Sequence, residues 1–248
     1  MIWLPTSLDP PLLKLPLLWS ATWLAVRAQS PPTPPPRKDE MQKFESVGDT
    51  MVPQKIMRGS VLIQNSIYWT NAVCETAVVL SAYASPSTRT TLLSLLAREP
   101  SAAAHIQPTA AWLAGAALMH AGALVRLACY RALGADFTWE LAVRRGHVLA
   151  TRGPYAVVRH PSYVGAALIY AGALAVLFGP GGWFGACVGW GSVWSWVFAG
   201  GCAAWAVGVP VMLMRRVGRE DEVLRQAFGE EWEAYARRVP YRLVPYIF

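Results

Sequence analysis

The stretch YVGAALIYAGALAVLFGPGGWFGACVGWGSVWSWVFAGGCAAWAVGVPVMLM covers residues 163–214 and is hydrophobic over almost its whole length. It is too long for one membrane crossing, because the hydrocarbon core of a bilayer needs about 20 helical residues. The sequence GPGG at residues 179–182 offers a turn near its middle. The stretch therefore predicts a hairpin of two transmembrane helices.

The composition of the whole chain supports a membrane protein. Of 248 residues, 54% are hydrophobic and 15% are charged, against about 25% charged in an ordinary soluble domain. Twelve tryptophans and 20 glycines fit this class, since Trp favours the membrane interface and Gly is frequent in membrane helices. The sequence therefore excludes an ordinary soluble domain.

Further apolar segments cover residues 61–83 and 109–130, with a shorter one at 15–26. Together with the hairpin, these predict four clear spans and a weaker fifth span at the N-terminus. Asn65, Asn71 and Glu75 are polar for a lipid-facing helix, so we expect them to face the bundle or a cavity. The predicted fold class is all-α, a polytopic transmembrane helical bundle with a cytosolic C-terminal amphipathic helix.

The net charge of +7 comes from short basic clusters between apolar segments, a pattern typical of positive-inside topology rather than of nucleic-acid binding. One cluster precedes the hairpin and the other follows it: Arg144, Arg145, Arg152 and Arg159, then Arg215, Arg216 and Arg219. Because a hairpin crosses the membrane twice, both clusters are expected in the cytosol.

The cysteines and the proline-rich segment are not predicted to take part in catalysis. The cysteines, Cys74, Cys129, Cys187 and Cys202, lie in apolar surroundings without C-x-x-C spacing, so neither disulfides nor a metal site is predicted. Residues 30–43 are rich in proline and charge, which favours an extended, solvated linker, with an SH3-type ligand as the alternative. No removable signal peptide is expected, because a basic n-region is lacking.

Residues 147–165, HVLATRGPYAVVRHPSYVG, contain more charged and aromatic residues than a membrane anchor requires. Pro161 disfavours helix at His160 and suits the first turn of a helix, so a helix should begin there. Its free N–H groups favour an anion. The alternative is that Arg159, His160 and the neighbouring tyrosines only anchor a helix end at the lipid headgroups.

Residues 216–229, RVGREDEVLRQAFG, predict an amphipathic helix. Its apolar face continues beyond this stretch, with Leu224, Phe228, Trp232 and Tyr235 at helical spacing. Arg216 and Glu220 are four residues apart and can pair on an exposed surface. Such a pair stabilises little, so both a surface pair and a functional site remain open.

These two stretches resemble isoprenylcysteine carboxyl methyltransferases and their broader membrane methyltransferase relatives. The resemblance rests on the element R-H-P-x-Y-x-G and on R-x-x-x-E-[ED]-x-x-L-x-x-x-F-G, followed by Trp232, Tyr235 and the sequence RVP at residues 238–240. It covers roughly residues 136–240. Asp221 stands where the family usually has a second Glu, which keeps the charge.

Composition and hydropathy divide the first part of the chain into 1–29, a weak hydrophobic segment; 30–60, a Pro-rich and charged linker; and 61–135, transmembrane helices. The resemblance implies that 136–248 is a methyltransferase core with the hairpin and a cytosolic cofactor site. It implies S-adenosyl-L-methionine as cofactor. By position in the motifs it implies these cofactor-binding residues: Glu140, His147, Val148, Leu149, Ala150, Tyr155, His160, Pro161, Ser162, Tyr163, Glu220 and Asp221. Arg216 is expected to bind the substrate, and Arg216 or Arg159 to hold its carboxylate during catalysis.

The implied reaction is methyl transfer to the C-terminal carboxylate of an isoprenylated cysteine in proteins or peptides, without nucleic acid as partner. The resemblance places the protein in the endoplasmic reticulum membrane with its site facing the cytosol. One alternative keeps the cofactor and changes the acceptor to a phospholipid amine, a sterol-like lipid or a small thiol. Another alternative is a non-enzymatic membrane scaffold or transporter.

Overall fold

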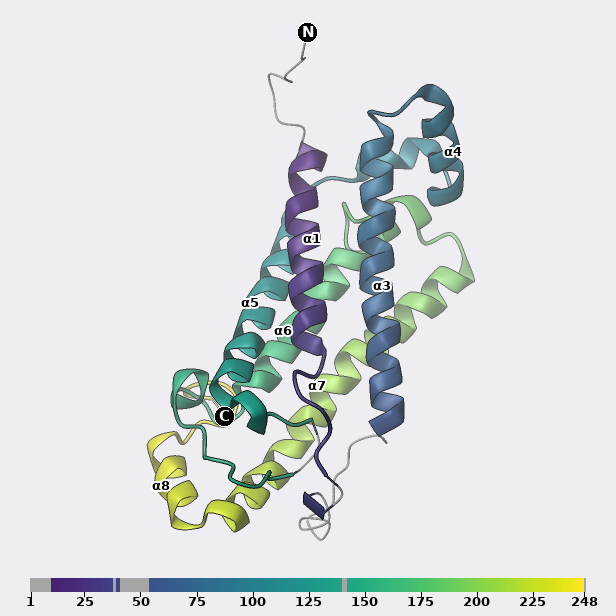
Figure 1. The fold of residues 1–248 in the computed structure, drawn as a ribbon. Helices are drawn as coiled ribbons and strands as arrows, with labels where there is room; N and C mark the ends of the chain where they lie inside the picture. Colours follow the sequence, from purple (N-terminus) through teal and green to yellow (C-terminus); the bar gives the residue numbers. More distant parts are fainter. Residues whose placement is uncertain (1–9, 38, 41–53, 140–141, 248) are drawn as a thin grey trace. The chain divides into compact units, whose positions relative to one another are not determined.

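The computed structural model describes residues 10–37, 39–40, 54–139 and 142–247 (Figure 1). All regular elements in these ranges are helical, which confirms the all-α fold class. The long helices are α1 (Pro10–Gln29), α3 (Gln54–Ser81), α5 (Ala110–Leu133), α6 (Pro161–Phe178) and α7 (Val193–Phe228). The short ones are α4 (Pro86–Leu96), α8 (Glu230–Arg238), η2 (Pro100–His105), η3 (Gly134–Asp136), η4 (Gly153–Ala156) and the π-helix η5 (Phe184–Val188).

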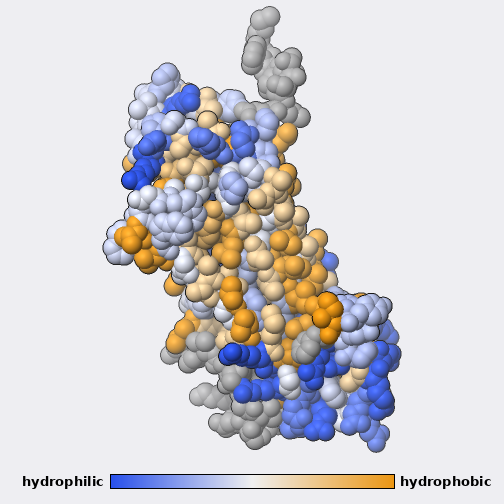
Figure 2. All heavy atoms as spheres, turned by 180° about the vertical axis from the view of Figure 1, so that it is seen from behind, coloured by the Kyte–Doolittle hydropathy of each residue, from blue (hydrophilic) through white to orange (hydrophobic). Residues whose placement is uncertain are grey.

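Three of the described helices are long and apolar enough to cross a membrane, namely α5 with η3, α6 and α7. The protein is therefore an integral membrane protein. The fourth span that we expected, at residues 61–83, is not among these three helices. Residues 61–83 do form most of the 28-residue helix α3, but polar residues such as Gln64 and Glu75 keep α3 below the hydropathy of the three spans. Hydrophobic side chains nevertheless cover much of the face that Figure 2 shows.

The predicted turn between α6 and α7 is confirmed. Helix α6 ends at Phe178, and Gly181 has a φ of +90°, a conformation that glycine adopts at little cost. A Cβ atom at Gly181 would lie 2.3 Å from the carbonyl oxygen of Gln107. The π-helix η5 follows the turn, so α7 begins only at Val193.

The chain forms two compact units, each built from three separate stretches. The first unit comprises the described residues of Met1–Val26, Leu62–His120 and Ile169–Ala206. The second comprises those of Arg27–Val61, Ala121–Leu168 and Val207–Phe248. Both basic clusters and both sequence motifs belong to the second unit.

A buried ion pair connects α1 and α3 within the first unit. Lys14 Nζ lies 2.5 Å from Glu75 Oε1, and both side chains are fully buried. Lys14 Nζ also donates to the carbonyl oxygen of Gly181 at 2.6 Å, and the Trp183 backbone N–H donates to Glu75 Oε2 at 2.8 Å. Removing one charge of such a pair typically costs about 3–5 kcal/mol, because the other charge stays buried. The pair therefore fixes α1 and α3 to the hairpin turn.

The polar residues of α3 behave largely as expected. Glu75 and Asn71 have exposed fractions of 0% and 3%, which confirms that these two side chains face the interior. The first part of the linker differs from our expectation, because it is not solvated over its whole length. In the second unit, Thr33 Oγ1 donates to the carbonyl oxygen of Phe137 at 2.5 Å, and Arg144 Nη2 donates to that of Pro34 at 2.5 Å.

Helices α5 and α6 approach closely at small residues. In the first unit, a Cβ atom at Gly172 would lie 2.4 Å from the carbonyl oxygen of Gly115 and 2.7 Å from the backbone nitrogen of Met119. Small residues allow this contact, which membrane helices use because lipid tails provide no hydrophobic driving force between them. A larger side chain at Gly172 would push the two helices apart.

We therefore expect Gly172→Leu to lower the unfolding midpoint in detergent, with a loss of about 1–3 kcal/mol typical of overpacking. Gly200→Leu on α7 is the matched control, because no atom of the described residues lies within 4 Å of a Cβ atom built at Gly200. Thermal unfolding followed by circular dichroism measures both. Equal midpoints for Gly172→Leu and Gly200→Leu would contradict the close helix contact.

Candidate functional site

The two sequence motifs meet within the second unit. There the start of α6 contacts the C-terminal end of α7, which is predicted to face the cytosol. Helix α6 begins at Pro161, as predicted. The backbone before it is held by the C-terminal segment: the N–H of Arg159 donates to the carbonyl of Tyr241 at 3.0 Å, and that of His160 to the carbonyl of Arg242 at 2.8 Å. The two residues before α6 are therefore held against the C-terminal segment.

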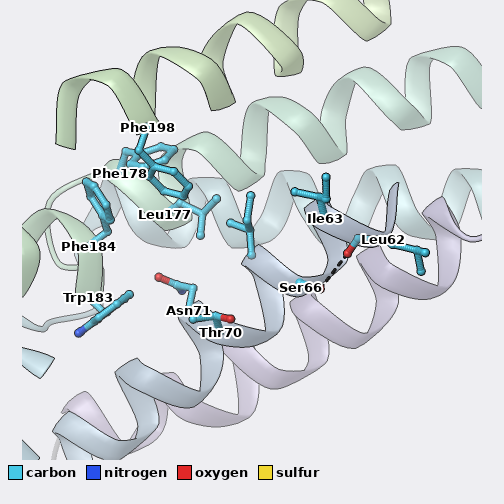
Figure 3. A pocket seen from close by; sticks show the side chains of 11 residues that line it. Leu62, Ile63, Ser66, Thr70, Asn71, Leu177, Phe178, Trp183, Phe184 and Phe198 are labelled. Atoms are coloured by element: carbon cyan, nitrogen blue, oxygen red, sulfur yellow. Dashed lines mark hydrogen bonds between the residues drawn. The ribbon is translucent and has the colours of Figure 1, made fainter. Parts of the chain in front are cut away.

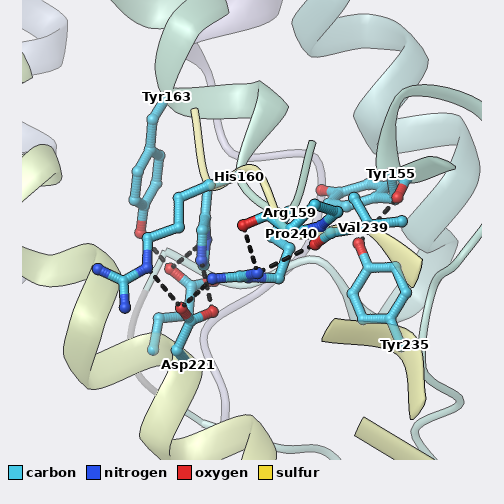
Figure 4. A network of polar contacts seen from close by, with 10 residues as sticks. Tyr155, Arg159, His160, Tyr163, Asp221, Tyr235, Val239 and Pro240 are labelled. Carbon is cyan, nitrogen blue, oxygen red and sulfur yellow. Dashed lines mark hydrogen bonds and ion pairs between the residues drawn. The ribbon is translucent and has the colours of Figure 1, made fainter. Parts of the chain in front are cut away.

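His160 lies between two neighbouring carboxylates of α7 (Figure 4). Its Nε2 is 2.9 Å from Asp221 Oδ1, and its Nδ1 is 3.6 Å from Glu220 Oε2. Tyr163 stacks on the imidazole, with ring centroids 5.6 Å apart, and its hydroxyl donates to Glu220. Residues 57 and 61 positions apart in the sequence thus form one polar cluster.

The charge of His160 is set by these carboxylates. Burial lowers the pKa of His160, but the hydrogen bonds and negative charges of Asp221 and Glu220 outweigh it and raise the pKa to about 9. The imidazole is therefore protonated at neutral pH and donates to acceptors on α7. A positive ring is what allows two adjacent carboxylates to lie beside it in a buried setting.

The two carboxylates differ in their surroundings. The Asp221 side chain is 8% exposed and contacts Arg159 Nη2 at 3.1 Å and Arg242 Nε at 3.4 Å, besides His160. The Glu220 side chain is 32% exposed. Asp221 is thus occupied by protein cations, whereas Glu220 keeps a surface for a ligand. Arg242 lies outside both motifs, and sequence analysis missed it.

Arg159 connects this cluster to the end of α8. Its Nη1 donates to the carbonyl oxygens of Val239 at 3.0 Å and Pro240 at 2.9 Å (Figure 4). The guanidinium therefore contacts the RVP segment and Asp221 together. These contacts with described residues give Arg159 a structural role. Its role in holding the carboxylate of the acceptor stays a prediction.

Arg216 is buried, with 3% of its surface exposed, and its Nη1 donates to the carbonyl oxygen of Trp139. This burial contradicts the alternative of an exposed Arg216–Glu220 pair. Since residues four apart lie on one helix face, Arg216 and Glu220 share a side of α7. Glu140, which follows Trp139 and was predicted to bind the cofactor, lies outside the described residues.

The last residue of the first motif, Gly165, has a packing role. A Cβ atom there would lie 2.7 Å from the carbonyl oxygen of Gly122 and 2.8 Å from Cγ of Arg126. Arg126 is itself buried and donates to the carbonyl oxygens of Ser162 at 3.1 Å and Ala28 at 2.7 Å. This arginine of α5 holds the start of α6, and no motif in the sequence indicated it.

The predicted cofactor loop packs on the C-terminal helices. Leu149 forms a buried cluster with Tyr235 and Val239, against which Leu224, Phe228 and Trp232 pack. This confirms the predicted apolar face. The helix is interrupted, however, because Gly229 has a φ of +52° and separates α7 from α8.

Individual residues of this loop differ in exposure. Val148 is 71% exposed, whereas Tyr155 is buried and its carbonyl accepts a hydrogen bond from the Tyr235 hydroxyl at 2.8 Å. The His147 ring contacts Phe228 edge to face, with centroids 5.4 Å apart. Burial lowers the pKa of His147, and its Nδ1 has no hydrogen-bond partner among the described residues.

These residues fit S-adenosyl-L-methionine by their chemistry. The partly exposed Glu220 carboxylate suits a cation or a hydroxyl pair, and the partnerless Nδ1 of His147 offers a further polar contact. The partly buried rings of Tyr163 and Phe228 suit a sulfonium or an aromatic base. The start of α6 differs from our expectation, since Pro161 and Ser162 are buried and the neighbouring anions are carboxylates of α7.

Comparison with known proteins defines the class further. The Isoprenylcysteine carboxyl methyltransferase (ICMT) family matches residues 115–199, which include the first motif and end before the second. Protein-S-isoprenylcysteine O-methyltransferase B of Arabidopsis thaliana is 30% identical over 128 residues, 51% of this chain and 55% of that protein. The Dictyostelium discoideum protein-S-isoprenylcysteine O-methyltransferase is 30% identical over 130 residues, 52% and 47% of the two chains.

A second group of relatives carries another name. Delta(14)-sterol reductase of Schizosaccharomyces pombe is 26% identical over 113 residues, 44% of this chain and 21% of that protein. The chain thus spans about half the length of the methyltransferase relatives and about a fifth of this reductase. The fold and site define an all-α integral membrane protein, and its resemblance to the isoprenylcysteine carboxyl methyltransferase family is confirmed over part of its length.

The pKa of His160 leads to a prediction about pH. Because the folded pKa, about 9, lies above the ordinary value of 6.5, the contacts of the protonated ring stabilise the fold fully below pH 6.5, and this contribution is lost as pH rises to 9. We expect the wild-type unfolding midpoint to fall over this range. His160→Gln should unfold at a lower midpoint and lack this part of the pH dependence. His105→Gln, at an exposed position, is the control, and an unchanged slope in His160→Gln would refute the assignment.

Proposed function

We propose that this protein transfers a methyl group from S-adenosyl-L-methionine to the C-terminal carboxylate of an isoprenylated cysteine. The observation that carries the proposal is the joint position of buried Arg216 and partly exposed Glu220 on one side of α7, beside His160 and Tyr163. A cation and an anion of the protein thus lie close enough to bind two ligands of opposite charge. The similarity to isoprenylcysteine methyltransferases supports the same reaction.

In this proposal Glu220 binds the cofactor, and His160 and Tyr163 hold Glu220 in place. The bound cofactor supplies an electrophilic methyl group on a sulfonium. Asp221 acts as a positioning residue, because its contacts with Arg159 and Arg242 fix the turn of α7 that carries Glu220. The loop at residues 147–150 and the ring of Tyr155 complete the proposed cofactor site.

Arg216 holds the acceptor carboxylate. That carboxylate is ionised at neutral pH, since the reference pKa of a chain terminus is about 3.5, so the chain needs no general base. Opposite charges of acceptor and sulfonium cancel as the methyl group moves. A site that excludes water from the carboxylate therefore favours transfer, provided that the guanidinium holds it in line.

The sterol reductase relatives raise a second candidate, reduction of a sterol double bond. Methyl transfer to a phospholipid amine, a sterol-like lipid or a thiol is a third. A buried guanidinium favours an anionic acceptor over an amine or a sterol, because it can bind a carboxylate through charge-assisted, bidentate hydrogen bonds. We further propose that the site faces the cytosol from the endoplasmic reticulum membrane, as the flanking arginines favour; attached glycosylation tags test this side.

The cofactor role of Glu220 is tested by Glu220→Gln, which keeps the size of the side chain and removes its charge. We expect the affinity for S-adenosylhomocysteine to fall at least about tenfold, because hydrogen bonds to charged groups contribute about 1.5–3 kcal/mol. Isothermal calorimetry on the purified protein measures it. Glu222→Gln is the matched control, since Glu222 lies on the same helix and pairs with Arg225 at 3.0 Å. Unchanged affinity in Glu220→Gln would remove the residue from the cofactor site.

The reaction itself is tested by methyl transfer to S-farnesylcysteine and S-geranylgeranylcysteine analogues, beside phospholipid and Delta(14)-sterol substrates. We expect transfer only to the prenylcysteines. Arg216→Lys should raise the acceptor KM, because lysine lacks the bidentate fork, and Arg216→Ala should nearly eliminate turnover. Cofactor affinity should stay close to that of wild type in both variants. Arg215→Lys, at the exposed neighbour, is the control.

Normal acceptor kinetics in Arg216→Ala would shift the carboxylate contact to Arg159. Reduction of the sterol without methyl transfer would replace the proposal by the reductase function.

A further inference from the structure

A cavity of about 460 Å³ lies within the first unit (Figure 3). Its walls come from α3, the end of α6, the π-helix η5 and the start of α7. All of its lining residues are uncharged, and none belongs to the candidate functional site. Its volume lies in the range of about 300–1,000 Å³ typical of pockets that bind one small molecule.

One wall of the cavity is a rigid aromatic surface. Phe178, Phe184 and Phe198 contact one another, with ring centroids 4.9 Å, 5.9 Å and 5.5 Å apart. Mutually packed rings have little freedom to rearrange. This wall therefore favours a ligand with a stiff, flat apolar body over a flexible chain, which loses more conformational entropy on binding.

The opposite wall carries one buried polar group without a partner. Asn71 is 3% exposed, and among the described residues its Oδ1 accepts no hydrogen bond. Its carboxamide lines the cavity next to Thr70 (Figure 3). A buried acceptor without a donor costs free energy, so a ligand that donates one hydrogen bond here is favoured.

The cavity is bordered by exposed uncharged residues, which include Ser66 and Thr70. Leu62 and Ile63 line it with exposed fractions of 68% and 65%. Exposed apolar side chains of this kind contact hydrocarbon in a membrane protein. A ligand dissolved in the bilayer can enter past uncharged side chains, whereas a charged headgroup would find no counter-ion among the lining residues.

We infer that this cavity binds a sterol, whose single hydroxyl donates to Asn71 and whose fused rings lie against the three phenylalanines. The three observations lead to the same ligand class: an uncharged lining, one acceptor in need of a donor, and a rigid wall open to lipid. The inference does not depend on the proposed methyl transfer. It concerns a bound lipid that is recovered chemically unchanged.

The test uses the full chain in sterol-free phosphatidylcholine nanodiscs, titrated with cholesterol and with cholestenone, whose ketone cannot donate. We expect saturable cholesterol binding and about fivefold weaker cholestenone binding, the ratio that corresponds to one hydrogen bond. Asn71→Leu should bind both equally weakly, because the discriminating acceptor is gone. Asn65→Leu, which removes a carboxamide from α3 outside the cavity, should keep the discrimination. Phe198→Ala should weaken both sterols by a similar factor.

Several results would overturn the inference. They are equal binding of the two sterols by the wild-type protein, discrimination that persists in Asn71→Leu, and competition by hexadecanol as strong as that by cholesterol. Displacement of cholesterol by S-farnesylcysteine would instead assign the cavity to the acceptor chain. Methyl transfer measured on the same sterol-free samples should be retained in Asn71→Leu, so a failure of methyl transfer and a failure of sterol binding are separate outcomes.

Discussion

The contact of protonated His160 with the carboxylates of Asp221 and Glu220 is the interaction on which the rest of the site depends. It joins the residue before α6 to the polar end of α7, and it does so in a buried setting. Removal of the ring charge would leave two adjacent carboxylates with one cation fewer, which is costly where water is excluded. The position of Glu220, and with it the face of α7 that carries Arg216, follows from this contact.

Helical geometry then gives the two carboxylates different environments. Consecutive residues of an α-helix point about 100° apart, so Asp221 and Glu220 cannot face the same surroundings. Asp221 lies among His160, Arg159 and Arg242, whereas Glu220 remains one-third exposed. One acidic pair in the sequence thus supplies both a structural ion pair and a group that is open to a ligand.

The first unit also contains buried charges of opposite sign that pair with each other. Lys14 and Glu75 carry opposite charges in apolar surroundings and neutralise each other at 2.5 Å. Lys14 Nζ also donates to the carbonyl oxygen of Gly181, and Glu75 Oε2 accepts from the backbone N–H of Trp183. Asn71 departs from this pattern, because its buried oxygen has no partner among the described residues. Its position in the lining of the cavity is what points to a ligand.

The sequence by itself determined the features that depend on neighbouring residues. The start of α6 at Pro161 follows from a restricted φ, the turn at residues 179–182 from glycine, and the apolar face around Leu224 from helical periodicity. Only the tertiary structure decided which charges meet: the contacts of Arg126, of Arg242 and of the Lys14–Glu75 pair join residues far apart in the chain. Periodicity and local conformation carry no information on such distances, because burial and pairing are set by how the helices pack.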